Sequence, residues 1–226
     1  MGEEEWSTWF ERAWVVREEE VYPRLFGAIS PSICVLTPDM FLETFKQENF
    51  DPRWLTYGVF ECPPSGARRS WLYVSSGLSN AWEDDKPNPE GVSGLGMEFV
   101  LETPDQATWA LQRLQHVVVF QILIACGRYP GRELLDLYDR IPLRGPISPE
   151  PSDLTWLMLA PPSGYTSAFQ LPTGSVHILT VVGITDDEAA HARSHGGETL
   201  LDLLRAGAAY PVTNRRRKSL VGVAQE

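Results

Sequence analysis

The sequence is poor in cysteine, and its three cysteines, Cys34, Cys62 and Cys126, stand far apart in 226 residues. An odd number without a Cys-x-x-Cys pair argues against both a disulfide framework and a zinc ribbon. Long apolar runs are also absent, since the stretch from Val117 to Cys126 is about half of the ~20 residues that a membrane span needs. The acidic start lacks the apolar region of a secretory signal, so we expect a cytoplasmic protein without a membrane segment.

Basic residues are scarce as well: 19 Lys and Arg face 30 Asp and Glu, and the formal net charge is −11. A protein that binds DNA or RNA must neutralise phosphates, so this balance argues against a nucleic-acid partner. An acidic surface instead attracts basic partners, although the same charge can serve solubility alone. The run from Arg215 to Lys218 has the composition of a nucleic-acid or nuclear-import patch, but its place near the C-terminus favours a solvated segment.

The histidines lack the partners that a metal site requires. His191 and His195 have the four-residue spacing with which a helix presents two zinc ligands. Only Glu188 or Glu198 offers a third ligand nearby, and no His-Glu-x-x-His motif or cysteine pair is present. We therefore expect two exposed histidines and no metal ion.

Nucleophilic and phosphate-binding motifs are also incomplete. The serines of the run Ser75–Ser79 lack the Gly-x-Ser-x-Gly elbow that exposes a catalytic serine, and His177 falls in an expected strand. The Gly94-x-Gly96 pair precedes a strand, whereas a phosphate-binding loop follows a strand and opens a helix. These patterns favour a protein that is not an enzyme and binds no cofactor, although a triad assembled from distant residues stays open.

The order of the expected elements indicates an α+β fold. An amphipathic helix covers residues 1–22 and ends before Pro23, and a second, shorter helix follows Thr37. Thr103 and Gln106 form a capping box for a third helix, with Pro104 in its first position. Strands are expected over 54–60, 71–75, 95–101 (with one buried face), 154–160, 169–171 and 176–182, and a helix capped by Thr185 and Glu188 breaks at Gly196-Gly197.

We expect residues 1–226 to form a single domain, a mixed β-sheet flanked by helices. Residues 128–151 contain five prolines and form an irregular insertion, and residues 208–226 form a basic C-terminal segment. A split into two domains at the insertion stays open, but the strands on either side of it look like parts of one sheet.

Five motifs in the same order resemble the Suppressor of fused domain over residues 54–219. They include the paired Gly-Leu-Ser and Ser-Gly-x-Gly-x-Glu sequences, found here at Gly77–Ser79 and Ser93–Glu98. The others are Trp109 with Leu114–Gln121, similar to the family's Leu-x-x-x-Val-Phe-Gln, and Pro-x-Gly over 172–174 with Val-Gly-Ile-Thr-x-x-Glu up to 188. Then follow residues 200–205, similar to its Leu-Leu-Arg helix, and Val212-Thr213 with Arg215-Arg216, similar to its Val-Thr-x-x-Arg-Arg close.

This resemblance implies a binding fold similar to the N-terminal domain of that family, and no enzymatic activity. The animal member is a two-domain inhibitor that clasps a peptide of a transcription factor between its halves, partly by strand addition. Our sequence ends where the first half ends, so we do not expect the clasp. Stand-alone bacterial members are thought to act as immunity proteins that bind secreted toxins, and we expect a bacterial-type protein of this kind.

The expected contact with a protein partner is an acidic loop with one aromatic anchor. It is made by Trp82, Glu83, Asp84, Asp85 and Glu90, and it suits a basic target such as a nuclease toxin. An ordinary solvated loop is the plain alternative, and strand addition at a sheet edge is another binding mode. An intracellular regulatory or scaffold protein, and a hydrolase or metal-dependent enzyme that uses His177, His191 or His195, are the alternative functions.

Overall fold

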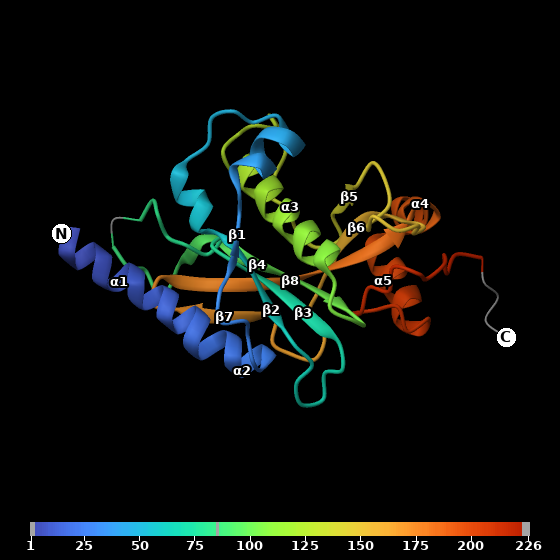
Figure 1. The fold of residues 1–226 in the computed structure, drawn as a ribbon, viewed down its shortest axis with the longest axis horizontal. Coiled ribbons are helices and arrows are strands. Elements are labelled where there is room, and N and C mark those ends of the chain that lie inside the picture. The colour runs from blue at the N-terminus through green and yellow to red at the C-terminus, as the bar shows by residue number, and fades with distance from the viewer. Residues whose placement is uncertain (1–2, 85, 223–226) are drawn as a thin grey trace.

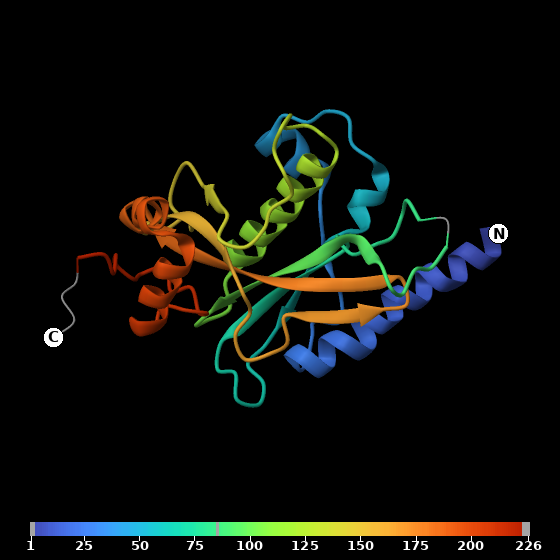
Figure 2. The same ribbon diagram turned by 180° about the vertical axis from the view of Figure 1, so that it is seen from behind.

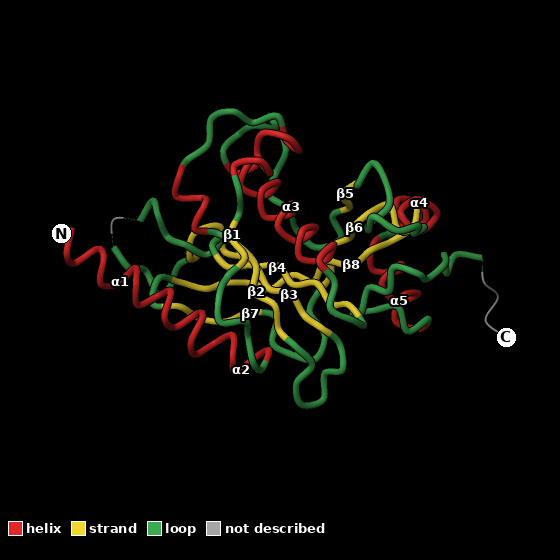
Figure 3. The backbone as a smooth tube through the Cα atoms, in the orientation of Figure 1, coloured by secondary structure: helices red, strands yellow, loops and turns green. Residues whose placement is uncertain are grey.

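The computed structural model describes residues 3–84 and 86–222, which form one mixed β-sheet with helices on both faces (Figures 1 and 3). The strand order is β1-β2-β3-β4-β8-β6-β5, and β7 pairs with β8 beside this path. The central strands β4 and β8 run parallel to each other, and the other paired strands are antiparallel. This arrangement confirms the α+β fold and the single mixed sheet expected from the sequence.

The strands are β1 (Cys34–Val35), β2 (Gly58–Cys62), β3 (Trp71–Ser76), β4 (Val92–Thr103), β5 (Arg140–Pro142), β6 (Leu154–Ala160), β7 (Ala168–Leu171) and β8 (Gly174–Thr185). The helices are α1 (Glu3–Val15), α2 (Tyr22–Phe26), α3 (Thr108–Ala125), α4 (Asp186–His195) and α5 (Gly197–Ala206). Three short helical segments are not α-helical: η1 (Val16–Val21) and η2 (Met40–Thr44) are π-helical, and η3 (Pro52–Thr56) is a 3₁₀-helix. The strands expected near 71–75, 154–160, 169–171 and 176–182 are therefore confirmed.

Two apolar layers fill the space between the sheet and its helices. On one face α3 packs against β4, with Leu114 and Val118 in the same cluster as Phe99 and Leu101. On the other face Tyr22 and its neighbours on α2 cover the alternate residues of β3 and β4 (Figure 2). Because side chains alternate along a strand, β4 contributes to both layers and is buried on both faces.

The helices α4 and α5 close one end of the sheet over β6 and β8. The capping box expected at Thr185 is present, since the Glu188 amide donates to the Thr185 hydroxyl and the Thr185 amide donates to the Glu188 carboxylate. Gly196 has a φ of 94°, which is a conformation that glycine adopts without strain, and it separates the two helices at the expected break.

Two expected boundaries near the N-terminus were wrong. The first helix does not end before Pro23, because η1 is wound more widely and Pro23 falls in the first turn of α2, where its missing amide is no loss. The strand expected at 54–60 begins only at Gly58. The Asp51 carboxylate accepts a hydrogen bond from the Arg53 amide, and Asp51-Pro52 thereby starts the 3₁₀-helix in its place.

Two expectations for β4 and its exit were also wrong. The strand does not have a single buried face, because Glu98 and Glu102 are as buried as Phe99 and Leu101. The capping box at Thr103 is absent, since the Thr103 hydroxyl donates to the Asp105 carbonyl and α3 begins only at Thr108. The amide of Ala107, the residue before the helix, donates instead to the Tyr73 hydroxyl (2.6 Å).

Residues 128–151 are irregular apart from β5. Among the described residues, no helix combines the length and the apolar character that crossing a bilayer requires. The division of the domain into an N-terminal helix, an insertion and a basic C-terminal segment stays a prediction.

Candidate protein-binding site

The first two sequence motifs meet inside the protein around the carboxylate of Glu98. Its Oε1 atom accepts hydrogen bonds from the Gly77 and Ser79 amides (3.0 Å each) and from the Ser79 hydroxyl (2.7 Å). Its Oε2 atom accepts a hydrogen bond from the Ser75 hydroxyl. The side chain is fully buried, and these four donors occupy the carboxylate. The motif residues therefore hold the loop after β3 onto β4, and they do not present a reactive group.

Glycine is required where this loop approaches β4. Gly94 has a φ of 57°, and a Cβ atom there would lie 2.5 Å from the Asn80 carbonyl oxygen and 2.7 Å from that of Leu78. The Leu95 amide then donates to the same Leu78 carbonyl (2.8 Å). The Gly-x-Gly pair thus permits a close backbone approach near the start of β4, as its position in the sequence predicted.

The N-terminal helix is attached to this loop through Arg17, which sequence reasoning did not single out. Its guanidinium is buried and donates to the Ser79 hydroxyl (3.0 Å), the Asn80 side-chain oxygen (2.7 Å) and Glu18 (2.8 Å). Glu18 in turn accepts from the Ser76 hydroxyl (2.6 Å). In the sequence Arg17 is one more polar residue on an amphipathic helix, and only the tertiary contacts show its role.

The predicted acidic loop borders a pocket of about 390 Å³ at the end of α3. Trp82 lies half-buried in its wall and packs against Phe10 of α1, with ring centroids 4.2 Å apart. Glu83 is exposed at the rim, Asp84 also lines the pocket, Glu90 is exposed outside it, and Asp85 lies outside the described residues. The structure thus places Glu83 and Asp84 together, while Trp82 contributes to packing between α1 and the loop.

The pocket has apolar walls and a charged rim. Its walls include Trp54, Leu95 and Ile122. At the rim the Arg53 guanidinium contacts Asp51 (2.6 Å) and Glu83 (3.0 Å) and lies over the Trp82 ring, 5.5 Å from its centroid. An apolar cavity with carboxylates at its mouth has the chemistry to receive the aliphatic stem and positive end of a lysine or arginine side chain.

The pKa values of Asp51 and Cys126 are shifted by the charged groups around this pocket. The hydrogen bond from Arg53 lowers the pKa of Asp51, so this carboxylate stays ionised well below neutral pH. Partial burial raises the pKa of the Cys126 thiol at the end of α3, and the negative charges of Asp51 and Glu83 raise it further. At the rim, the two carboxylates of Asp51 and Glu83 thus share the single positive charge of Arg53.

The other candidate catalytic residues are dispersed. His177 is exposed on β8, while His191 and His195 stack on each other on α4 with centroids 4.3 Å apart. Among the described residues no group of three or more His, Cys, Asp or Glu side chains is arranged to hold a metal ion. Ser75, Ser76 and Ser79 are buried and donate to carboxylates.

On the open sides of β2 and β5, few backbone groups are free for strand addition. The carbonyls of Tyr57 and Glu61, at the outer edge of β2, accept from the Leu36 and Ser30 amides (2.8 Å each). At the opposite edge, Pro142 of β5 has no amide to donate, and alternation with Leu143 places it on the open side. Pairing of a partner strand at these edges is therefore hindered.

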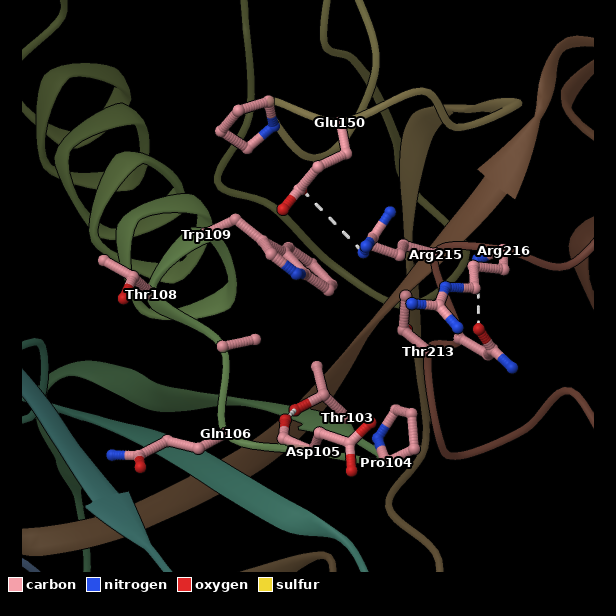
Figure 4. Close-up of a pocket in the computed structure, with 13 residues that line it drawn as sticks. Thr103, Pro104, Asp105, Gln106, Thr108, Trp109, Glu150, Thr213, Arg215 and Arg216 are labelled. Carbon is pink, nitrogen blue, oxygen red and sulfur yellow. Dashed lines mark hydrogen bonds and ion pairs between the residues drawn. The ribbon is translucent and has the colours of Figure 1, made fainter.

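The basic run near the C-terminus is not the solvated segment that we expected. The Arg217 side chain is nearly buried and contacts both carboxylate oxygens of Glu188 (2.6 Å each), and Lys218 contacts Asp153 (2.9 Å). Arg215 approaches Glu150 across a pocket of about 480 Å³ in which Trp109 faces the same segment (Figure 4). Three of the four basic side chains in the run, those of Arg215, Arg217 and Lys218, thus form ion pairs with acidic residues elsewhere in the chain.

The sequence and the fold are similar to those of known proteins. A family model described as Suppressor of fused protein matches residues 53–218. The Suppressor of fused homologs of Homo sapiens and Mus musculus are each 26% identical over 171 residues, which are 69% of this chain and 33% of theirs. The chain therefore spans about a third of the length of these curated relatives.

Three solved structures share the fold. The first, of a Sufu–Fu complex, is 24% identical with a TM-score of 0.61 and covers 92% of this chain and 91% of its own. Drosophila Suppressor of Fused is 23% identical with a TM-score of 0.57, over 80% of this chain and 50% of that one. A homolog from Neisseria gonorrhoeae is 16% identical with a TM-score of 0.60, over 96% of this chain and 100% of that one.

Proposed function

The chain belongs to the Suppressor of fused family, and on that premise we propose that it is a non-enzymatic protein-binding module, an immunity-type inhibitor that neutralises a cognate toxin by direct binding. One solved structure of the family is itself a complex, that of Sufu with Fu. We place this protein in the cytoplasm, where such an inhibitor would meet its target.

The observation that carries the proposal is the acidic, apolar-walled pocket beside the loop of Glu83 and Asp84. A partner with exposed lysine or arginine side chains would find both an apolar surface and opposite charge there. The four hydrogen bonds to Glu98 also support a non-enzymatic role, because they occupy the polar residues of the family motifs in holding the fold together. Chemistry on a substrate has no comparable support in the described residues.

Charge reversal at the rim tests this site. We expect Glu83→Lys to weaken binding of the partner about tenfold, because it replaces attraction of a basic group by repulsion. The side chain is exposed, so loss of its contact with Arg53 has little effect on stability. The partner is recovered by cross-linking in the native cells, and its affinity for the purified variants is measured by calorimetry at two salt concentrations.

Glu198→Lys on α5 is the matched control, since it makes the same exposed change of charge on a helix at the far end of the sheet. It should bind as the wild type does, and salt should weaken the wild-type complex more than that of Glu83→Lys. Equal affinity for all three proteins would exclude this pocket. A captured toxin whose activity is blocked in equimolar mixture supports the inhibitor role, whereas a captured metabolic or regulatory protein favours the scaffold alternative.

A further inference from the structure

Three buried glutamates differ in how many donors serve them. Glu98 accepts four hydrogen bonds, and Glu188 accepts from Arg217 and from the Thr185 and Leu220 amides. Glu102 is only 3% exposed, yet the Ser70 hydroxyl is the one hydrogen-bond donor to its carboxyl group within the described residues. A carboxyl group with a single donor can accept further hydrogen bonds, so Glu102 has room for a partner that Glu98 and Glu188 lack.

Glu102 lines a pocket of about 580 Å³, which is in the size range of small-molecule sites. Five segments line it: the end of α2, the β2–β3 hairpin, the end of β4, the loop between β6 and β7, and residues 211–212. Figures 1 and 2 show these segments gathered at the same end of the sheet. Burial raises the pKa of Glu102, and the Ser70 hydrogen bond and the charge of Arg68 offset only part of that effect.

A second polar group in this pocket also lacks a partner. Tyr165 lines the pocket, and its hydroxyl is buried without a hydrogen bond in the described structure. The Thr180 hydroxyl, which is buried and also lacks a hydrogen bond of good geometry, is the polar group beside it. The carboxyl group of Glu102 and the hydroxyl of Tyr165 therefore belong to residues that line the same pocket.

The mouth of the pocket is positively charged in a protein of net charge −11. Arg24 and Arg69 line it, are exposed, and have no ion-pair partner among the described residues. Arg68 is different, because its guanidinium donates to four backbone carbonyls, those of Phe26, Cys62, Pro63 and Ser70. Two arginines are thus available to an anionic group at the entrance.

We propose that this pocket binds a small hydroxylated anion, of the class of sugar acids or sugar phosphates. A hydroxyl group both donates and accepts, so one sugar hydroxyl can donate to Glu102 and accept from Tyr165. The carboxylate or phosphate of the ligand then meets Arg24 and Arg69 at the mouth. This site lies apart from the acidic pocket and does not depend on the proposed inhibitor function.

Calorimetry with D-glucose 6-phosphate and D-gluconate tests the proposal, with D-glucose and inorganic phosphate as comparators. We expect at least one of the two acids to bind, and both comparators to bind at least tenfold more weakly, because each lacks one half of the recognised chemistry. The two acids distinguish a phosphate from a carboxylate at the mouth. Failure of both acids to bind at millimolar concentration, or equal binding of glucose or phosphate, would overturn the proposal.

Tyr165→Phe is the decisive variant, because it removes only a hydroxyl that has no partner in the folded protein. Its melting temperature should stay within about 2 °C of the wild type, while affinity for the bound acid falls about tenfold. Glu102→Gln should weaken the same ligand. Tyr210→Phe is the matched control, since that hydroxyl already donates to the Pro161 carbonyl and is not needed for the ligand. Unchanged affinity in Tyr165→Phe would sink the assignment.

Discussion

Replacing Glu98 by alanine is expected to lower the free energy of unfolding by about 4 kcal/mol or more, because four donors lose their acceptor inside the protein. The Gly77 and Ser79 amides and the hydroxyls of Ser75 and Ser79 all point at this carboxylate. Each buried donor left without a partner costs about 1–3 kcal/mol, and the total stability of a domain is about 5–15 kcal/mol. Urea unfolding followed by tryptophan fluorescence measures the change.

Two comparisons make this result specific. Glu98→Gln keeps the shape and one acceptor oxygen, so its loss of stability should lie between those of the wild type and Glu98→Ala. Glu90→Ala removes an exposed carboxylate that precedes the same strand, and should change stability by less than about 0.5 kcal/mol. If Glu98→Ala unfolded within 1 kcal/mol of the wild type, roughly the size of one hydrogen bond, the scaffold role of these motifs would be wrong.

Replacing Arg217 by alanine is expected to cost about 3–5 kcal/mol, since it leaves the Glu188 carboxylate buried without its cation. Glu188 is fully buried, and Arg217 also donates to the Gly183 carbonyl on β8 (2.7 Å). Through these contacts Arg217 fixes the C-terminal segment over α4 and β8. Besides urea unfolding, trypsin should cleave between residues 215 and 218 faster in the variant, because the segment is no longer held.

The neighbouring residue provides the control. Arg216 has the same charge but an exposed side chain, so Arg216→Ala should change stability by less than about 0.5 kcal/mol. The double variant Glu188→Gln/Arg217→Met should recover part of the loss, because no unpaired charge then remains buried. Equal effects of Arg216→Ala and Arg217→Ala would mean that the run acts only through its net charge.

Much of the fold could be predicted from sequence periodicity. The apolar runs near 154–160 and 176–182 indicated central strands, and the capping box at Thr185 set the start of α4, because each signal involves residues close in the chain. The capping box predicted at Thr103 was wrong, because contacts with residues distant in the sequence decide the local structure there. The Thr103 hydroxyl donates to the Asp105 carbonyl, the Ala107 amide donates to the Tyr73 hydroxyl on β3, and the helix begins only at Thr108.

The candidate sites were harder to predict, because their residues come from distant parts of the chain. The acidic composition of the loop at Glu83 and Asp84 was visible in the sequence, but Arg53, Trp54 and the end of α3, which form the rest of the pocket, carry no local signal. The assignment of this loop to partner binding stays a prediction. Glu102 looked like the exposed face of an alternating strand, and its pocket was not predicted at all.

The sequence alone determined the class of fold, the family motifs and the positions at which most helices and strands begin, because hydrophobic period, turn residues and caps act over a few neighbouring residues. Only the tertiary structure decided which charges are internal. Arg17, Glu98, Glu188 and Arg217 look like ordinary polar residues in the sequence. They can be buried because partners 19 to 63 residues away satisfy them. Desolvation is a property of the assembled environment, so no local pattern encodes it.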